Sequence, residues 1–429
     1  MVQRGRPIVR DRPLPPRRLR DIVLPLRLSL RTSVLGGRPQ LAILLVLISL
    51  VMAGNGIVAP VLPLYAMEFG VGGALVGMLI TLFGVGRLVA NIPAGILSER
   101  FGRRPFLSLG PALIAVGAVG AAMATTFEML LFWRFVQGIG SGIYMTTSAA
   151  VLVQLSTPGR RGYVMALYQG FLLLGAGVGP ALGGALAARF GSAAPFWGYA
   201  VVAVAALLLV LFAFREPQEA EPDEEETTGP PVTMREFLRN RAYVLLCTIT
   251  FWIFFTRTAG QWLAIPLVGN QRFGLTVDLI GLALTSSAVA NAAMLPLVGP
   301  ATARFGAVTV AALSTALVAG ALILVAFAEA VPVYWAALVM LGIGSGFNGP
   351  SVAAAIADIT PSNLFGPAMG TQRAIADTGF VSGPIIVGLV HDLTPFGYSG
   401  ALAGNAVMLA GAGVLVWIFV RTPRRAGPG

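Results

Sequence analysis

The sequence has no lysine, a single cysteine and a single histidine, and only 11% of its 429 residues are charged. The lone Cys247 lies in an apolar run, which excludes a disulfide framework and a cysteine metal site. The lone His391 excludes the common histidine metal sites and a histidine proton relay. The apolar runs show no nucleophile paired with a base and no phosphate-binding loop. We therefore expect neither an enzyme nor a bound metal or cofactor.

Hydrophobic side chains make up 56% of the residues, which leaves too little polar surface to cover a water-soluble domain. A helix needs about 20 apolar residues to cross ~30 Å of hydrocarbon. The apolar runs therefore predict an all-α membrane protein with twelve transmembrane helices. We place the spans at residues 41–66, 74–97, 105–126, 130–155, 163–188, 194–214, 242–268, 279–302, 307–328, 331–359, 366–390 and 400–420.

Arginine supplies every basic side chain, and its distribution predicts membrane orientation instead of nucleic-acid binding. The tails and the even-numbered turns hold 23 of the 29 arginines, the odd-numbered turns hold two, and the spans hold four. An even number of spans places both termini on one side, and positive charge gathers on the cytoplasmic side. We expect a multi-pass protein of the inner (plasma) membrane with both termini in the cytoplasm.

The chain divides into two six-span halves, flanked by tails and joined by a linker. Residues 1–40 carry ten arginines and six prolines, which predicts a disordered cytoplasmic tail attracted to anionic lipid headgroups. The linker contains an acidic run that keeps it solvated and extended. The predicted segments are a basic tail at 1–40, a bundle at 41–214, an acidic cytoplasmic linker at 215–241, a second bundle at 242–420 and a cytoplasmic tail at 421–429.

The two halves repeat each other at a constant offset of 204 residues. The matching motifs are Gly-Ile-Gly-Ser-Gly at 138–142 and 342–346, Gly-x-x-x-Gly-Pro at 175–180 and 379–384, and Gly followed by Arg-Phe-Gly at 95–102 and 299–306. A shared offset for three motifs predicts two pseudo-symmetric six-helix bundles.

A charged turn at 95–107 separates spans two and three. Three arginines against one carboxylate cannot lie in hydrocarbon, so we expect this turn in water. Its spacing resembles the Gly-x-Leu-x-acid-Arg-x-Gly-Arg-Arg signature of the major facilitator superfamily, with Glu99 in place of the usual aspartate. The predicted conformational hinge comprises Gly95, Glu99, Arg100, Gly102, Arg103 and Arg104. The second copy has Ala303 where Glu99 stands in the first.

Spans four and five carry two further motifs, which begin at Arg134 and Gly175. Small residues at four-residue spacing favour close packing of membrane helices, and this packing alone is one interpretation of both motifs. Together with the hinge, and with Asn55 in span one, they resemble the twelve-span drug:proton antiporters of the superfamily, associated with multidrug resistance. The span-five motif comprises Gly175, Gly179, Pro180, Gly183 and Gly184.

The resemblance covers residues 41–420 and implies the major facilitator fold, with two bundles that rock about a central cavity. It also associates the span-five motif with export and Arg134 with proton coupling. Many relatives have a membrane carboxylate in span one or four. Neither span has one here, apart from Glu68 at the end of span one.

Few ionisable groups lie within the spans, and each unpaired charge there costs ~3 kcal/mol. Asp358 lies near the end of span ten, whereas Asp377 lies deep in span eleven, four residues after Arg373. An intrahelical ion pair and a role in coupling are equally good interpretations of this spacing. We predict proton coupling through Asp377, Arg134 and Arg373.

Span two offers an interdomain partner for Asp377, because Arg87, Asn91 and Gly95 share one helix face. In the family this face approaches span eleven. We hypothesise that Glu99 meets the helix start at 362–363 when the cytoplasmic side is shut, and that Arg87 reaches Asp377 in the same state.

Four intramembrane arginines against one deep carboxylate predict a positive central cavity. The predicted lining residues are Asn55, Arg87, Arg257, Gln261 and Trp262. A positive cavity favours an anionic or zwitterionic substrate. Alternatively, the arginines bind backbone carbonyls or lipid phosphates, and the aromatic side chains of span seven face lipid.

The sequence therefore predicts a monomeric secondary transporter in contact with membrane lipid, which exports small amphipathic solutes in exchange for protons. One alternative is an importer or facilitator of organic anions. A sensor or a lipid-handling protein on the same fold is another, because fold does not fix function.

Overall fold

The computed structural model describes residues 39–155, 161–215, 234–361 and 364–420, and within these ranges it contains helices and no strand. The prediction of an all-α protein is confirmed. The predicted tails, apart from Pro39 and Gln40, and residues 216–233 of the linker lie outside the described residues.

The first group of helices comes from the first predicted half. Its members are α2 (Pro39–Val58), α3 (Leu62–Met67), α4 (Gly73–Phe101), α5 (Arg103–Ala122), α6 (Phe127–Leu155), α7 (Arg161–Phe190) and α8 (Ala194–Ala213). The predicted first span, 41–66, is interrupted between α2 and α3. Pro60 lies in this interruption, and a proline has no backbone N–H to continue a helix.

The second group comes from the second predicted half. Its members are α9 (Met234–Phe237), α10 (Arg241–Phe255), the π-helix η2 (Thr256–Ala264), α11 (Ile265–Phe273), α12 (Val277–Phe305), α13 (Ala307–Ala326), α14 (Val331–Ile359), α15 (Phe365–Leu393) and α16 (Gly397–Phe419). Helices α10, η2 and α11 run on without a break, so the predicted seventh span is one helix with a wider central turn.

Eleven helices among the described residues are long and apolar enough to cross a membrane. Helix α6 is a twelfth long helix, of 29 residues, and it is less apolar because it contains Arg134, Gln137 and several hydroxyl side chains. Buried polar groups of this kind are tolerated in a membrane helix that packs against its neighbours. Helix α6 does so, since it lies against both α4 and α5.

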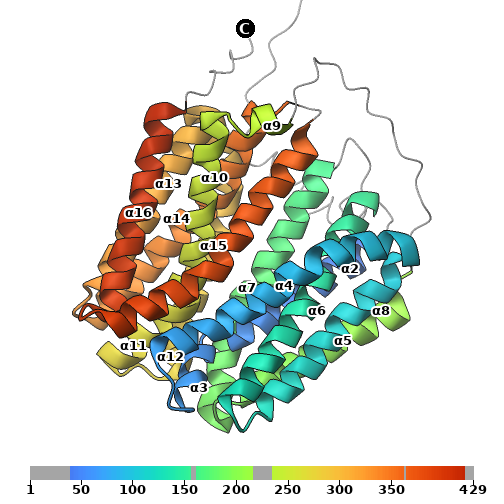
Figure 1. Ribbon diagram of the computed structural model, residues 1–429, viewed down its shortest axis with the longest axis vertical. Coiled ribbons are helices and arrows are strands. Elements are labelled where there is room, and N and C mark those ends of the chain that lie inside the picture. The colour runs from blue at the N-terminus through green and yellow to red at the C-terminus, as the bar shows by residue number, and fades with distance from the viewer. Residues whose placement is uncertain (1–38, 156–160, 216–233, 362–363, 421–429) are drawn as a thin grey trace, which may run out of the picture.

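The two groups approach each other near α3 and α11 and spread apart toward α9 (Figure 1). We call the end that carries α9 and the turn between α4 and α5 the hinge end, and the other the opposite end. Two pairs of long helices join the groups, α4 with α15 and α7 with α12. These crossings are the framework for the candidate site.

Close packing within each group repeats at the same offset as the sequence. A Cβ on Gly138 of α6 would collide with the backbone of Phe83 in α4, and one on Gly342 of α14 would collide with that of Ser287 in α12. Both residues of the second pair lie 204 positions after their counterparts. The recurring glycine motif therefore fixes the same helix contact in each group.

Candidate transport site

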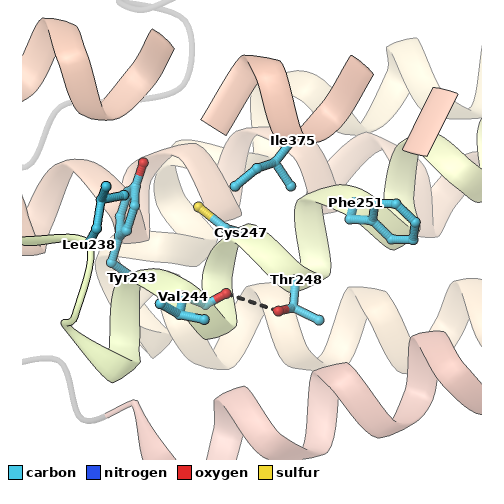
Figure 2. A pocket seen from close by; sticks show the side chains of 7 residues that line it. All are labelled: Leu238, Tyr243, Val244, Cys247, Thr248, Phe251 and Ile375. Carbon is cyan, nitrogen blue, oxygen red and sulfur yellow. Dashed lines mark hydrogen bonds between the residues drawn. The ribbon is translucent and has the colours of Figure 1, made fainter. Parts of the chain in front are cut away.

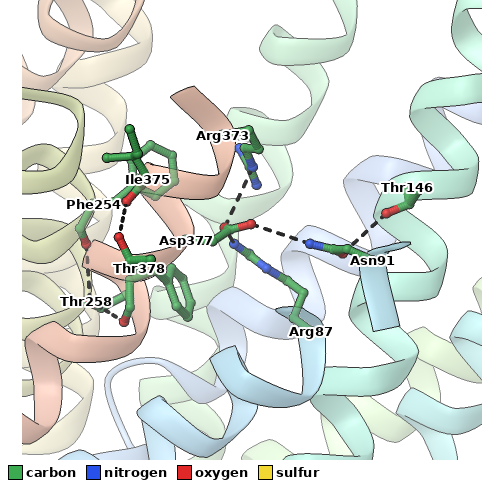
Figure 3. A network of polar contacts seen from close by, with 10 residues as sticks. Arg87, Asn91, Thr146, Phe254, Thr258, Arg373, Ile375, Asp377 and Thr378 are labelled. Carbon is green, nitrogen blue, oxygen red and sulfur yellow. Dashed lines mark hydrogen bonds and ion pairs between the residues drawn. The ribbon is translucent and has the colours of Figure 1, made fainter. Parts of the chain in front are cut away.

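Arg87 of α4 and Asp377 of α15 form an ion pair that joins the two helix groups (Figure 3). The Asp377 carboxylate is 4% exposed and the Arg87 side chain 11% exposed, so the pair is largely shielded from water. A buried charge of this kind is strongly destabilised when its partner is removed. The predicted interdomain pair is thus brought together in this conformation.

Asn91 extends the network from Asp377 toward α6. Its Nδ2 donates to Asp377 Oδ2 at 3.4 Å, and Thr146 Oγ1 of α6 donates to Asn91 Oδ1 at 3.3 Å. One helical turn separates Arg87 from Asn91, so both reach the same carboxylate. The first group therefore holds Asp377 through two side chains of α4.

Arg373 is the second cation at this carboxylate. Its Nε lies 3.7 Å from Asp377 Oδ1, and its side chain is 51% exposed. The guanidinium also stacks over the ring of Phe254 at 5.4 Å. Both pairings considered from the sequence, within α15 and across to α4, are present at once. One carboxylate thus faces two guanidinium groups, one buried and one open to solvent.

Phe380 lies beside the ion pair and links it to span seven. The Arg87 guanidinium stacks over the Phe380 ring at 4.5 Å, and the Trp262 ring meets Phe380 edge to face at 5.5 Å. Two of the predicted cavity residues, Arg87 and Trp262, therefore contact the same aromatic ring.

Arg257 and Gln261 lie one turn apart on η2, which widens span seven at this level. Arg257 is partly buried, its strongest charged neighbours are Arg373 and Arg87, and within the described part of the chain it forms no hydrogen bond or ion pair. Local π-helical turns often occur at functional sites. In the part of the chain that the structure describes, Arg257 is thus a cation without an anionic partner, with two other cations as its charged neighbours.

Asn55 is the predicted cavity residue that the described contacts do not bring to this cluster. It lies partly buried on α2, and within the described ranges its side chain has no hydrogen bond to Arg87, Arg257 or Asp377.

Arg134 lies apart from Asp377 and is 1% exposed. Its Nη1 donates to Gln137 Oε1 at 2.6 Å and its guanidinium stacks over Phe83 at 4.5 Å, whereas its Nε has no partner among the described residues. The Phe83 ring lies 6.5 Å from Phe380. Two aromatic rings therefore separate Arg134 from the Arg87–Asp377 pair, although the sequence prediction groups Arg134 with Asp377 and Arg373 as coupling residues.

The turn between α4 and α5 is held by backbone geometry and by two of its arginines. Gly102 has φ +87°, a conformation that other residues rarely adopt. Arg103 Nη1 donates to the Ala150 carbonyl at 2.8 Å, and Arg104 Nη2 donates to the Leu211 carbonyl at 2.7 Å. These contacts fasten the start of α5 to the ends of α6 and α8 and satisfy carbonyls there.

Glu99 and Arg100 are exposed, and Gly95 lies near Thr146. The hypothesised partner of Glu99, residues 362–363, lies outside the described residues. The Arg87–Asp377 half of the hypothesis is seen here with Glu99 exposed, and the contact of Glu99 with 362–363 stays a prediction.

The span-five motif packs α7 against both groups. Cβ atoms on Gly175, Gly179 or Gly183 would collide with the backbone of α2, whereas one on Gly184 would lie 2.7 Å from the Val277 carbonyl of α12. Pro180 presents its backbone to Gly281 of α12. The motif therefore lies at the contact between the two groups. It occupies the half of α7 that is near the opposite end.

The other crossing, between α4 and α15, uses equivalent positions. Gly77 of α4 faces the backbone of Pro384, just as Gly281 of α12 faces the backbone of Pro180. Gly281 lies 204 positions after Gly77, and Pro384 lies 204 positions after Pro180. Sequence reasoning identified the motif in spans five and eleven. It did not identify Gly77 and Gly281, since an isolated glycine in a membrane span gives no signal of its partner.

Asp392 is a contact residue that the sequence did not reveal. Its Oδ1 and Oδ2 accept from the backbone N–H groups of Gly73 and Ala74, at 2.9 and 2.8 Å. The carboxylate from the end of α15 thus caps the first turn of α4, and its negative charge interacts favourably with the positive end of the α4 dipole. A capping residue is visible in a sequence when it precedes its helix, and this one comes from another helix.

Comparison with known proteins identifies the family. The model of the Major Facilitator Superfamily matches residues 44–268 and 248–429. Multidrug resistance protein 1 of Bacillus subtilis (strain 168) is 26% identical over 359 residues, which cover 82% of this chain and 90% of that protein. An uncharacterized MFS-type transporter of Methanocaldococcus jannaschii is 21% identical over 374 residues, which cover 86% and 95%.

Solved structures of transporters share the fold. A bacterial homologue of the human lysosomal transporter Spinster, in an inward-facing and occupied conformation, superposes with a TM-score of 0.76 at 16% identity, over 92% of this chain and 100% of that chain. The human organic anion transporter MFSD10 gives a TM-score of 0.63 at 19% identity, over 88% and 99%. With the family model spanning nearly all of the described helices, this multi-pass membrane protein belongs to the major facilitator superfamily of transporters.

Proposed function

We propose that this transporter exports small amphipathic organic solutes in exchange for protons, with Asp377 as the proton carrier. The observation that carries the proposal is the sharing of one shielded carboxylate between Arg87 and Arg373. Two opposite charges 4 Å apart attract by ~4 kcal/mol at an effective dielectric of 20, before desolvation is subtracted. Protonation of Asp377 removes this attraction and so biases the rocking of residues 41–214 against residues 242–420.

The arrangement favours a zwitterionic solute for exchange. An ammonium group competes with a proton for the Asp377 carboxylate, while an acidic group binds Arg257, which has no anionic partner among the described residues. Competition for one carboxylate makes solute and proton mutually exclusive, which exchange requires. Export is supported by the names of the multidrug resistance relatives and by the span-five motif, and the chain carries the whole site, which supports a monomer.

A second candidate function is uptake or facilitated movement of an organic anion. Arg257 favours it, because this cation has no anionic partner among the described residues. Protonation of Asp377 would free Arg87 and Arg373 for an anion, so that proton and anion bind together and move in the same direction. The direction of proton movement therefore distinguishes the two functions.

The arginine distribution supports an orientation with the hinge end in the cytoplasm of a cell whose inner (plasma) membrane holds the protein. In that orientation the structure is closed toward the outside by Asp392 and by the glycine contacts of α4 and α12.

The test is a proton-flux assay with purified protein in liposomes that contain a pH-sensitive dye. Zwitterionic, anionic and cationic solutes are supplied in turn under an imposed pH gradient. Zwitterion movement opposed by protons supports exchange, and anion movement accompanied by protons supports the second function. Solute movement without proton movement contradicts coupling.

A further inference from the structure

An apolar groove runs along the outer face of the second group, between α10 and α15. Its volume is about 270 Å³, and Figure 2 shows its lining side chains, with Cys247 in the middle of the α10 stripe and Ile375 opposite. In Figure 1, α10 lies between α15 and α16 on the side away from the first group. The lining residues are Leu238, Tyr243, Val244, Cys247, Thr248, Phe251 and Ile375.

The polar atoms in this lining are satisfied within the protein. Tyr243 Oη donates to the Ala368 carbonyl at 2.7 Å, and Thr248 Oγ1 donates to the Val244 carbonyl at 3.0 Å. The groove therefore presents mainly carbon and suits a hydrocarbon occupant.

The groove begins at the hinge end and follows α10 into the membrane span. Arg241, Val244 and Thr248 lie at positions i, i+3 and i+7 of one helix face, and Phe251 follows one turn later. The ten residue-to-residue steps from Arg241 to Phe251 rise about 15 Å along the helix. A chain in the groove would thus pass from the membrane surface into the hydrocarbon region.

Two cations, Arg239 and Arg241, adjoin the lining residues Leu238 and Tyr243 in the chain. Arg239 and Arg241 are exposed, and within the described ranges neither forms an ion pair. Their backbone is held in place by Phe237, whose ring packs on Tyr243 at 4.7 Å, and by Asn240, whose side chain accepts from the Ala242 N–H. Positive charge beside an apolar groove complements an anionic headgroup attached to an acyl chain.

We propose that this groove binds an anionic phospholipid of the surrounding bilayer, with one acyl chain along α10 and the phosphate at Arg239 and Arg241. The site is separate from the transport site, since Asp377 of α15 is paired with Arg87 and Asn91 of α4 and lies outside the groove lining. The lipid is a resident partner, whereas the transported solute binds between the two groups.

The proposal is tested by native mass spectrometry of the full chain with phosphatidylglycerol and phosphatidylcholine of matched acyl chains. The wild type should retain phosphatidylglycerol preferentially. Each arginine near an anionic headgroup is worth about fivefold in binding, so R239Q/R241Q should reduce phosphatidylglycerol retention by about 25-fold and leave phosphatidylcholine unchanged. The matched control is R304Q, an exposed arginine on α12 at the same end, which should behave as wild type.

A second variant tests the groove itself without removing charge. Val244→Trp fills the groove and should reduce retention of both lipids, while Val407→Trp, on the exposed side of α16, is its control. A phosphatidylglycerol with a photoreactive group in the acyl chain should label the segment 238–251 in wild type and not in Val244→Trp. Equal retention of the two lipids by wild type, equal losses in R304Q and R239Q/R241Q, or labelling confined to other segments would each overturn the proposal.

Discussion

The Arg87 guanidinium and the Asp377 carboxylate pair across the two helix groups while those groups are packed together at the opposite end. The pair lies midway along α4 and α15, between the exposed hinge and the capped start of α4. Because Asp377 also faces the solvent-exposed Arg373, a change at one carboxylate acts on both a buried contact and a group open to water.

Arg257 should act on substrate recognition and not on proton binding. Arg257→Gln removes a cation that has no anionic partner among the described residues, so the fold loses no ion pair. We expect about a tenfold higher KM for solutes with an acidic group, in line with a charged hydrogen bond worth ~1.5 kcal/mol or more. Initial rates in liposomes measure this, and a solute without an acidic group serves as control. An equal loss for both solutes would show a structural role.

Asp392 should stabilise closure of the opposite end. Asp392→Ala removes two hydrogen bonds to the first turn of α4, and loss of a helix cap costs roughly 0.5–2 kcal/mol. Nitroxide labels on cysteines at the exposed positions Phe190 and Phe396, in a Cys247→Ser background, report the separation of the groups at this end.

We expect a larger population of long distances in Asp392→Ala. The exposed Glu329, changed to Gln, is the matched control at the same end. An unchanged distance distribution in Asp392→Ala would show that the cap does not contribute to closure.

Gly77 and Gly281 should be equally intolerant of a methyl group. A Cβ at Gly77 would lie 2.6 Å from the Pro384 carbonyl carbon, and one at Gly281 would lie 3.1 Å from that of Pro180. Each alanine variant should therefore push apart the two helices of its crossing, α4 and α15 for Gly77 and α7 and α12 for Gly281. Each should also shift the distance between the spin labels at 190 and 396. Gly404→Ala is the control, because no atom lies within 4 Å of its added Cβ. A shift in one variant alone would contradict the equivalence of the two crossings.

Gly102 and Gly306 should each lose stability on substitution by alanine. Their φ angles are +87° and +84° with extended ψ, a conformation that is almost confined to glycine and costs another residue roughly 1–3 kcal/mol. Thermal unfolding in detergent should show a lower transition temperature for both variants and an unchanged one for Gly299→Ala, where space is open. A transition temperature for Gly306→Ala equal to that of wild type would show that the second turn relaxes.

The helices and their repeat could be read from the sequence, because long apolar runs and a constant offset are local patterns. The Arg87–Asp377 pair could also be proposed, because Arg87 lies on the face of span two that approaches span eleven in the family. The sequence does not encode which end is closed, so the state hypothesised for the pair rests on the contact of Glu99 with 362–363, which lies outside the described residues.

Other features depend on contacts between helices that lie far apart in the sequence, and no local sequence pattern predicts such contacts. The π-helix η2 places Arg257 near Arg373 and Arg87, and an ordinary helix was expected there. Asp392 caps a helix more than 300 residues away in the chain. The resemblance implied by its motif groups Arg134 with Asp377, yet two aromatic rings separate the two residues.

The central claim is that Asp377 carries the proton, and Asp377→Asn tests it most directly. The amide keeps the shape of the side chain and cannot be ionised, so solute-dependent proton movement in liposomes should disappear, while exchange of labelled for unlabelled solute that lacks an ammonium group continues. Arg304→Gln, remote from the site, controls for handling of the protein. If Asp377→Asn still moves protons at the wild-type rate, Asp377 is not the carrier and the account is contradicted.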